Sequence, residues 1–309
     1  MRAIFVLAFI SPIIVTLCQY QNKVKALKDF NGLLTSSQLL EWGFDYNIDT
    51  MDLSGRGITE ISSETFQLFT NLETLDLDDN NIEKVHQNTF IGLKKLKLLK
   101  LSNNYITTIE TGAFNGLSNL EELDFMYNEI TSLKPGQFNG LDSLSTLWLY
   151  YNLIEIIEDN TFCNTMPNLW FLALAGNHLK SITSGSLKCL TNLEILDAWS
   201  NEISIIDDFS FTETPNLQKL DLDHNYITSV EPNTFYGTNL HVLYLQGNPL
   251  EVIASKTFAG MDLLTYLFLG QNEIQFIDRN EFRALKSLVY LHLSYNQLQF
   301  LDRNFVQGK

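Results

Sequence analysis

The sequence contains two clusters of aspartates whose side chains could in principle bind a metal ion. Asp221, Asp223 and His224 lie close together in the chain, and Asp197 precedes them. Carboxylate oxygens are the ligands that Ca²⁺ prefers in proteins. A second cluster comes earlier in the chain: Asp76, Asp78 and Asp79. Neither cluster has the spacing of a known Ca²⁺-binding loop. A solvated acidic surface is the simpler interpretation, and the sequence predicts no metal site.

Residue combinations that enzymes use for catalysis do not occur in the sequence. There is no Gly-x-Ser-x-Gly, no His-Glu-x-x-His, no phosphate-binding glycine loop and no zinc-spaced cysteine pair. The five histidines are dispersed along the chain: His86, His178, His224, His241 and His292. We therefore predict that the protein is not an enzyme, uses no cofactor and acts by binding.

A pattern that recurs about every 24 residues must position these side chains. The pattern has leucine or another apolar residue at positions one, four and six, asparagine at position nine and phenylalanine at position nineteen, as in residues 144–162, with Leu187 and Val306 as exceptions to the phenylalanine. The pattern begins at Ile48 and occurs eleven times, with Arg56 as the one departure from asparagine at position nine. Alternating leucines predict a short strand whose successive residues face opposite sides. Units that cannot bury an apolar face alone do so by stacking.

The pattern resembles that of leucine-rich repeat proteins of the 24-residue type, over residues 48–309. The resemblance implies an α/β solenoid shaped as a horseshoe, with a parallel sheet on the concave side and loops or short helices on the convex side. The asparagines are then expected to satisfy backbone groups where each strand ends, and the phenylalanines to stack inside the convex side. The pattern is also similar to that of secreted leucine-rich immune proteins and Toll-type receptor ectodomains, which implies extracellular recognition.

Positions three, five, seven and eight of the repeat lie between the leucines and are expected to face solvent. In repeats four to seven several of them are large and apolar: Met126, Tyr127, Trp148, Tyr150, Tyr151, Phe171 and Trp199. Exposed apolar patches mark interaction sites, and Trp and Tyr are enriched among residues that dominate binding energy. The alternative is that cross-strand ring pairs only stabilise the sheet. Ala173 and Ala175, between the large rings, predict a dip in this patch.

Acidic residues at the edge of this patch indicate the chemistry of the partner. Asp197, Asp221 and Asp223 favour a partner with basic groups around an apolar centre. The formal net charge of −16 argues against nucleic acid and anionic membranes. We predict a protein or glycan partner on the concave face. The competing prediction is a structural or adhesive matrix protein that assembles through its repeats. A second aromatic group follows: Tyr244, Tyr266, Phe268, Tyr290, His292 and Tyr295.

Three segments divide the chain. Residues 1–18 carry an apolar run that is short for a membrane span and are predicted to be a signal peptide, so we expect secretion without stable membrane insertion. Residues 19–47 lie outside the pattern and are predicted to cap the first coil, with Trp42 in the core. Residues 48–309 are the repeat array. No cap follows its last repeat, so we expect a homo-oligomer contact at this open end.

Two cysteines, Cys163 and Cys189, remain after the predicted signal peptide and follow the nineteenth position in consecutive repeats. Neighbouring coils lie about 5 Å apart, close to the Cα spacing of a disulfide. The offset of the two cysteines within their repeats differs by one residue. The sequence therefore leaves a disulfide and two free thiols as alternatives.

Overall fold

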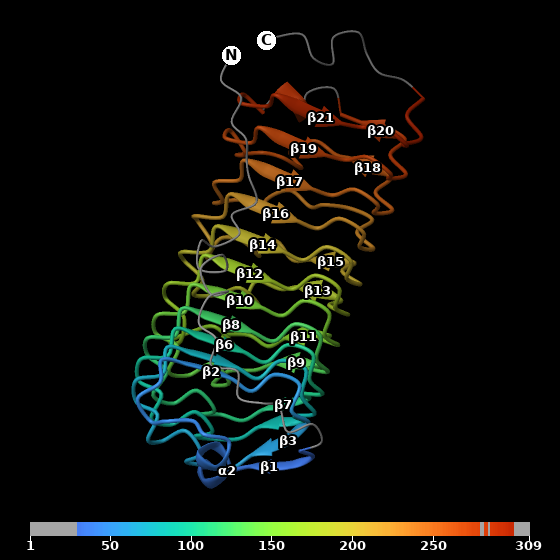
Figure 1. Cartoon of the computed structure of the whole chain (residues 1–309). Helices are drawn as coiled ribbons and strands as arrows, with labels where there is room; N and C mark the ends of the chain where they lie inside the picture. Colours follow the sequence, from blue (N-terminus) through green and yellow to red (C-terminus); the bar gives the residue numbers. More distant parts are fainter. Residues whose placement is uncertain (1–29, 279–280, 284, 300–309) are drawn as a thin grey trace.

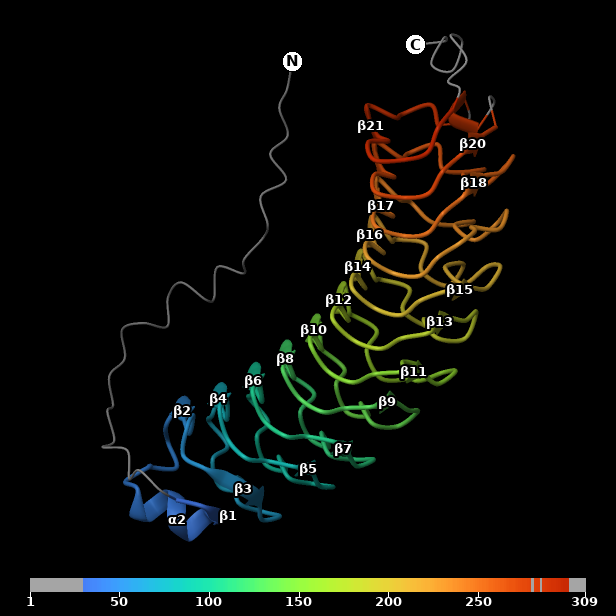
Figure 2. The same ribbon diagram turned by 90° about the vertical axis from the view of Figure 1, so that its right-hand side faces the viewer.

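A parallel sheet of eleven strands runs through the computed structural model, which describes residues 30–278, 281–283 and 285–299. Each repeat contributes one strand, and the strands follow one another in chain order (Figure 1). Figure 2 shows that this sheet lines the inner side of an arc. Its strands are β2 (Thr50–Asp52), β4 (Thr74–Asp76), β6 (Leu98–Lys100), β8 (Glu122–Asp124), β10 (Thr146–Trp148), β12 (Phe171–Ala173), β14 (Ile195–Asp197), β16 (Lys219–Asp221), β17 (Val242–Tyr244), β19 (Tyr266–Phe268) and β21 (Tyr290–His292).

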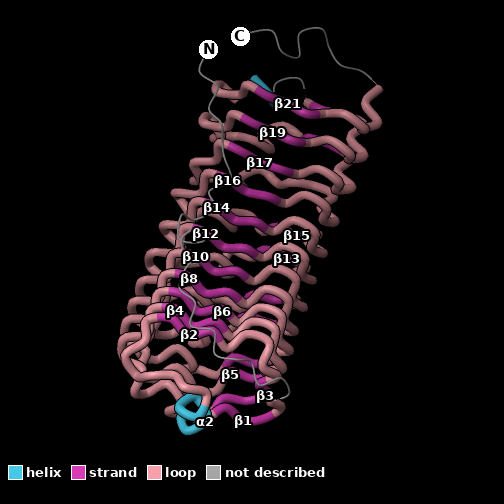
Figure 3. The backbone as a smooth tube through the Cα atoms, viewed as in Figure 1, coloured by secondary structure: helices cyan, strands magenta, loops and turns pink. Residues whose placement is uncertain are grey.

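The remaining part of each coil is built mostly from turns (Figure 3). Pairs of very short strands form small parallel sheets away from the concave face. They are β3 (Ile58–Ile61), β5 (Lys84–Val85), β7 (Thr108–Ile109), β9 (Ser132–Leu133), β11 (Ile156–Ile157), β13 (Ser181–Ile182), β15 (Ile205–Ile206), β18 (Val252–Ile253) and β20 (Phe276–Ile277). Within the described residues, helix is limited to α2 (Ser36–Glu41) and one 3₁₀ turn, η2 (Glu281–Arg283). The predicted horseshoe is confirmed.

The strands of the large sheet pair without a shift in register. Trp148, for example, lies beside Asp124 in β8 and Ala173 in β12, which occupy the same position of their repeats. Each position of the repeat therefore forms a column that crosses the concave face from coil to coil. Side chains in one column lie about 4.8 Å apart between neighbouring strands, the spacing of hydrogen-bonded strands.

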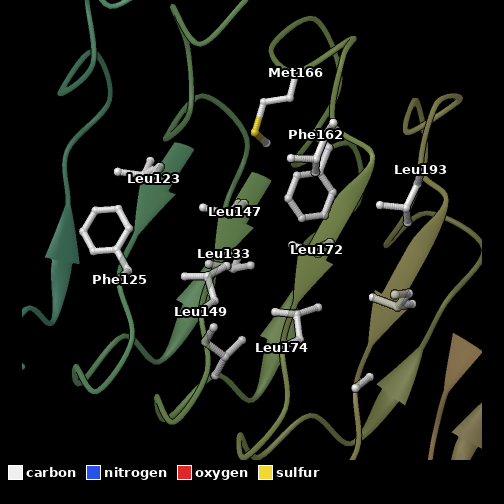
Figure 4. Close-up of a cluster of buried hydrophobic side chains, with 14 of the residues drawn as sticks. Leu123, Phe125, Leu133, Leu147, Leu149, Phe162, Met166, Leu172, Leu174 and Leu193 are labelled. Carbon is white, nitrogen blue, oxygen red and sulfur yellow. The ribbon is translucent and has the colours of Figure 1, made fainter. Parts of the chain in front are cut away.

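Leucines from the inward columns fill one continuous core (Figure 4). Phenylalanines at position nineteen stack behind them. The Phe90 and Phe114 rings are parallel, with centroids 6.2 Å apart, and Phe138 continues the stack at 6.3 Å. Leu187 interrupts it in the sixth repeat, where it is itself buried. A buried side chain of this size stabilises the fold by ~1.5–3 kcal/mol, so the spine contributes in every coil that carries a ring.

Asparagines at position nine join each coil to the one before it. The Asn152 amide donates to the carbonyls of Phe125 and Leu149, at 2.9 and 3.2 Å, and its oxygen accepts from the Ile130 N–H at 3.1 Å. The predicted ladder is therefore confirmed. A second ladder was not foreseen: exposed asparagines just before the first leucine donate to a carbonyl of the preceding coil. Its members are Asn119, Asn168, Asn192 and Asn216.

The described part of the predicted cap lies against the first coil. β1 (Gly32–Leu34) pairs with β3, and α2 follows it. Trp42 is only 4% exposed, and the Arg56 guanidinium lies 4.7 Å above its ring. This contact explains why position nine of the first repeat is not asparagine. The first repeat has no preceding coil whose carbonyl an asparagine amide could bond, and Arg56 stacks on the cap instead. The predicted signal peptide, residues 19–29 and residues 300–309 at the expected open end lie outside the described residues.

The sulfur atoms of Cys163 and Cys189 are bonded, with their Cα atoms 5.1 Å apart. The disulfide ties the fifth coil to the sixth on the side of the solenoid away from the large sheet. Of the two alternatives that the sequence left open, the structure has the disulfide. None of the helices in residues 30–278, 281–283 and 285–299 is long and apolar enough to cross a membrane.

Candidate binding surface on the concave face

Aromatic side chains of the fourth to seventh coils form one continuous cluster. Tyr127 and Tyr151 stack at 4.8 Å, nearly parallel. Trp148 lies 4.8 Å from Phe171, and Tyr151 lies 6.3 Å from Trp199. We call this cluster the first platform: Tyr127, Trp148, Tyr150, Tyr151, Phe171 and Trp199. Met126, also predicted for this surface, is half-buried in the same coil as Tyr127. The Trp170 ring extends the cluster, 5.7 Å from Phe171.

The two outermost tyrosines occupy a backbone conformation that does not favour them. Tyr127 and Tyr151 have φ of 54° and 53° and are 48% and 41% exposed. The same position is glycine in three repeats, including Gly55 and Gly247 with φ of 64° and 66°, and a larger residue with positive φ in the remaining ones. Left-handed backbone costs a bulky residue about 1 kcal/mol or more, and glycine very little. The fold alone would therefore favour a smaller residue at both positions.

Tyr150 spans a whole coil to reach an aspartate. Its hydroxyl donates to Asp197 Oδ2 at 2.5 Å, across the sixth coil. Ala173 and Ala175 of that coil are completely buried, so the predicted dip is filled. Burial raises the pKa of Asp197, and the Tyr150 hydrogen bond opposes that rise. Burial, and then the Asp197 charge, raise the pKa of Tyr150. Asp197, predicted at the acidic edge of the patch, accepts this hydrogen bond from a ring of the first platform.

The other two predicted aspartates follow in the eighth coil. Asp223 accepts hydrogen bonds from Gln246, from its backbone N–H at 2.6 Å and its side-chain amide at 2.9 Å. Asp221 Oδ1 accepts from the Asp223 N–H at 3.1 Å. Burial, and then the Asp223 charge, raise the pKa of Asp221 to about 7. Among the described residues, neither aspartate has a Lys, Arg or His nitrogen within 4.0 Å.

Beyond these acids lies a second aromatic cluster, the second platform: Tyr244, Tyr266, Phe268, Tyr290 and His292. Tyr244 and Phe268 stack at 4.5 Å, and the Lys219 ammonium lies 5.3 Å over the Tyr244 ring. The Gln246 side-chain oxygen lies 2.8 Å from His292 Nδ1, which links this platform to Asp223. The sequence grouped these rings but gave no sign of the link.

The earlier aspartates are arranged differently. Lys100 Nζ lies 2.7 Å from Asp76 Oδ2, and Asp78 accepts from the Ser102 N–H at 2.7 Å. Burial, and then Asp76, raise the pKa of Asp78 to about 7. Across the residues that the structure describes, no three His, Cys, Asp or Glu side chains converge on a point suited to a metal ion. The concave face therefore offers aromatic and carboxylate groups for binding.

Comparison with known proteins places the chain in a family. The leucine-rich repeat model matches residues 47–106, 70–130, 95–154, 118–179, 191–250 and 238–298. The chain belongs to the leucine-rich repeat family. This agrees with the resemblance carried by its repeated leucines and asparagines. A search of curated proteins gave no match for this leucine-rich repeat protein.

Solved structures show which leucine-rich repeat proteins share its shape. A TLR13–ssRNA13 complex matches with a TM-score of 0.78 and 28% identity, over 84% of this chain and 38% of that chain. The LRIM1/APL1C complex matches with a TM-score of 0.72 and 22% identity, over 88% and 48%. The Drosophila Toll–Spatzle complex, a hub in development and innate immunity, matches with a TM-score of 0.68 and 23% identity, over 87% and 39%. This chain thus spans less than half the length of each of these structures, and the matches at 22% and 23% identity show the fold alone.

Proposed function

We propose that this leucine-rich repeat protein is a secreted, non-enzymatic recognition protein that binds a protein partner through the first platform. The observation that carries the proposal is the pair Tyr127 and Tyr151. Their rings are exposed, stacked and held on backbone that favours a smaller residue. Rigid aromatic side chains at the centre of a surface are the residues that most often dominate binding energy.

The chemistry of the face and the structural relatives support a protein partner. Toll is in complex with Spatzle, and LRIM1 with APL1C. TLR13 is in complex with single-stranded RNA. In this chain the columns of the concave face carry more aspartates than lysines, including Asp197, Asp221 and Asp223. Phosphate backbones are bound by Lys and Arg side chains, so this face disfavours nucleic acid.

Secretion and a role in innate immunity are part of the same proposal. Disulfides persist in oxidising, extracellular compartments and are rare in the cytosol. The Cys163–Cys189 bond is therefore consistent with the predicted signal peptide of residues 1–18. The proposal of a role in innate immunity is based on the similarity to the Toll–Spatzle complex, and identifying the partner would test it.

The test is capture of a partner from extracellular fluid by the immobilised protein, with wild type and Trp148→Ala compared side by side. The matched control is Tyr226→Asn, which removes a ring that is 60% exposed but outside the platform. We expect one protein to be retained by wild type and the control and lost with Trp148→Ala. Equal retention by Trp148→Ala would reject the first platform as the site.

Two further readouts separate the alternatives. Enzymatic removal of glycans from the captured partner tests whether the protein or its sugar is recognised, and we expect capture to survive. Sedimentation of the free protein tests the structural alternative, in which the repeats assemble with one another through an open end. Concentration-dependent self-association without capture of another protein would favour that alternative.

A further inference from the structure

The acids of the eighth coil lie between two aromatic surfaces that are each held in place. On one side, Tyr150 is fixed by Asp197, in the strand next to Asp221. On the other side, the Gln246 side chain is hydrogen-bonded both to the Asp223 carboxylate and to His292 of the second platform. Asp221 belongs to neither chain of side-chain hydrogen bonds. In the described part of the chain, the one hydrogen bond to its carboxylate comes from the Asp223 backbone N–H.

The dimensions of this arrangement fit a short stretch of extended polypeptide. Trp199 ends the first platform one coil before Asp221, while Tyr244 and Phe268 lie one and two coils after it. Strands lie about 4.8 Å apart, so Trp199 and Phe268 are separated by roughly 14 Å along the solenoid. In an extended segment, residues one, three and five share a face and span roughly 13 Å.

We propose that Asp221 receives one arginine or lysine side chain of an extended partner segment, whose aromatic or large aliphatic side chains two residues to each side lie on the two platforms. This inference rests on the proposed function and specifies its partner. It also adds the second platform to the binding site, whereas the proposed function uses the first platform alone.

Charge explains why a cation fits this position. Asp221 faces Asp197 in β14 and Tyr244 in β17, and shares its own coil with Asp223 and Lys219. The Lys219 charge acts on Asp221, but its ammonium lies over the Tyr244 ring and, in the described part of the chain, forms no ion pair within 4.0 Å with the Asp221 carboxylate. Burial, Asp223 and Asp197 raise the pKa of Asp221, and the Asp223 N–H and the Lys219 charge only partly oppose that rise, so its ionised form is incompletely compensated. A guanidinium can supply that compensation and stack on rings at the same time.

The test uses two peptides with blocked ends: seven residues, tryptophan at positions two and six, serine at three and five, glycine at both ends, and arginine or citrulline at the centre. Citrulline keeps the shape of arginine and removes its charge. Binding to the whole protein is measured by calorimetry at pH 8. We expect the arginine peptide to bind at least ~10-fold more tightly than the citrulline peptide, since losing a close charge partner typically costs more than one decade of affinity.

Two variants place the effect at Asp221. In Asp221→Asn the preference for arginine should fall to about onefold, while the citrulline peptide keeps its affinity. The matched control Asp208→Asn, which changes an exposed aspartate in a convex turn, should keep the preference. Phe268→Ala should weaken both peptides equally. Melting curves confirm that each variant is folded.

Three outcomes would overturn the inference: equal binding of the two peptides to wild type, a preference that persists in Asp221→Asn, or no saturable binding of the arginine peptide. None of them removes the proposed function, which fails only if Trp148→Ala still captures the partner. Conversely, if the preference for arginine depends on Asp221 but capture is unaffected by Trp148→Ala, the contact between Asp221 and a basic side chain stands, while the proposed function fails in its choice of site.

Discussion

Replacing Tyr127 and Tyr151 by asparagine separates what the rings do for the sheet from what they do for a partner. Asparagine is the natural choice because Asn103 occupies the same position of the third repeat, with φ of 52°. Asparagine tolerates left-handed backbone better than tyrosine does. The double variant therefore removes both exposed rings and leaves the turn with a residue that this fold already uses there.

The expected change in stability is small because two effects oppose each other. Loss of the stacked pair, with centroids 4.8 Å apart, costs ~0.5–1.5 kcal/mol. Relief of backbone strain returns about 1 kcal/mol at each position. The free energy of unfolding should thus change by less than about 1.5 kcal/mol, which shifts Tm by no more than ~6 °C. Binding should fall much further, by ~30-fold or more, if the rings contribute the roughly 2 kcal/mol typical of dominant contacts.

The assay pairs thermal unfolding by circular dichroism with the Kd for the partner obtained by capture. Tyr226→Asn is the control, since it removes an exposed ring elsewhere and should change neither quantity beyond about twofold in Kd. A double variant that melts more than about 10 °C below wild type yet keeps its Kd would show that the rings stabilise the sheet. That result would refute the argument from backbone strain.

Three further predictions concern the scaffold and its acids. Cys163→Ser with Cys189→Ser should lower the free energy of unfolding in denaturant by ~3.5 kcal/mol, from a sequence separation of 26 residues; a loss below about 1 kcal/mol would contradict this. Asn152→Ala should cost ~2–4 kcal/mol by leaving buried backbone groups unpaired, against at most about 1 kcal/mol for the exposed Asn168→Ala. The folded pKa of Asp221 is about 7, above its ordinary value of 3.8, so the folded state binds the proton more tightly. Melting temperature should therefore fall from pH 4 to pH 7, and Asp221→Asn should reduce that fall.

The architecture could be predicted from the sequence because the repeat of about 24 residues determines it. A side chain that recurs once in every repeat occupies the same place in every coil, so Asn152 and its counterparts must form a ladder. The same logic gave the columns of the concave face and placed Trp148 beside Ala173. The sequence could not decide whether the disulfide forms. Cys163 and Cys189 are 26 residues apart, slightly more than one repeat, and only the conformation of the local turn determines whether their sulfur atoms meet.

Contacts that cross a coil were not predicted. Tyr150 and Asp197 are 47 residues apart, almost two repeats, and only the length of the tyrosine side chain lets them meet. A signal was nonetheless present, in the small residues beneath the crossing rings. A Cβ added to Gly176 would lie 2.5 Å from the Tyr151 ring, and one added to Gly270 would lie 2.7 Å from the His292 ring. Glycine or alanine in an outward column, beside a large ring one coil away, therefore indicates a side chain that lies across it.

Charge compensation distinguishes the two ends of the concave face. In the second and third coils, Asp76 already has its cation, Lys100, at 2.7 Å, and such a pair gains little from an added basic group. In the eighth coil Asp221 has no cation within 4.0 Å in the described structure, and the Lys219 charge only partly opposes the rise in its pKa caused by burial and the neighbouring acids. Asp76 and Asp221 occupy the same outward column of the sheet, so the fold does not require an aspartate at either position. Asp76 therefore has an ion-pair partner within the protein, whereas Asp221, between the two platforms, is the aspartate that we propose for contact with a basic group of a partner.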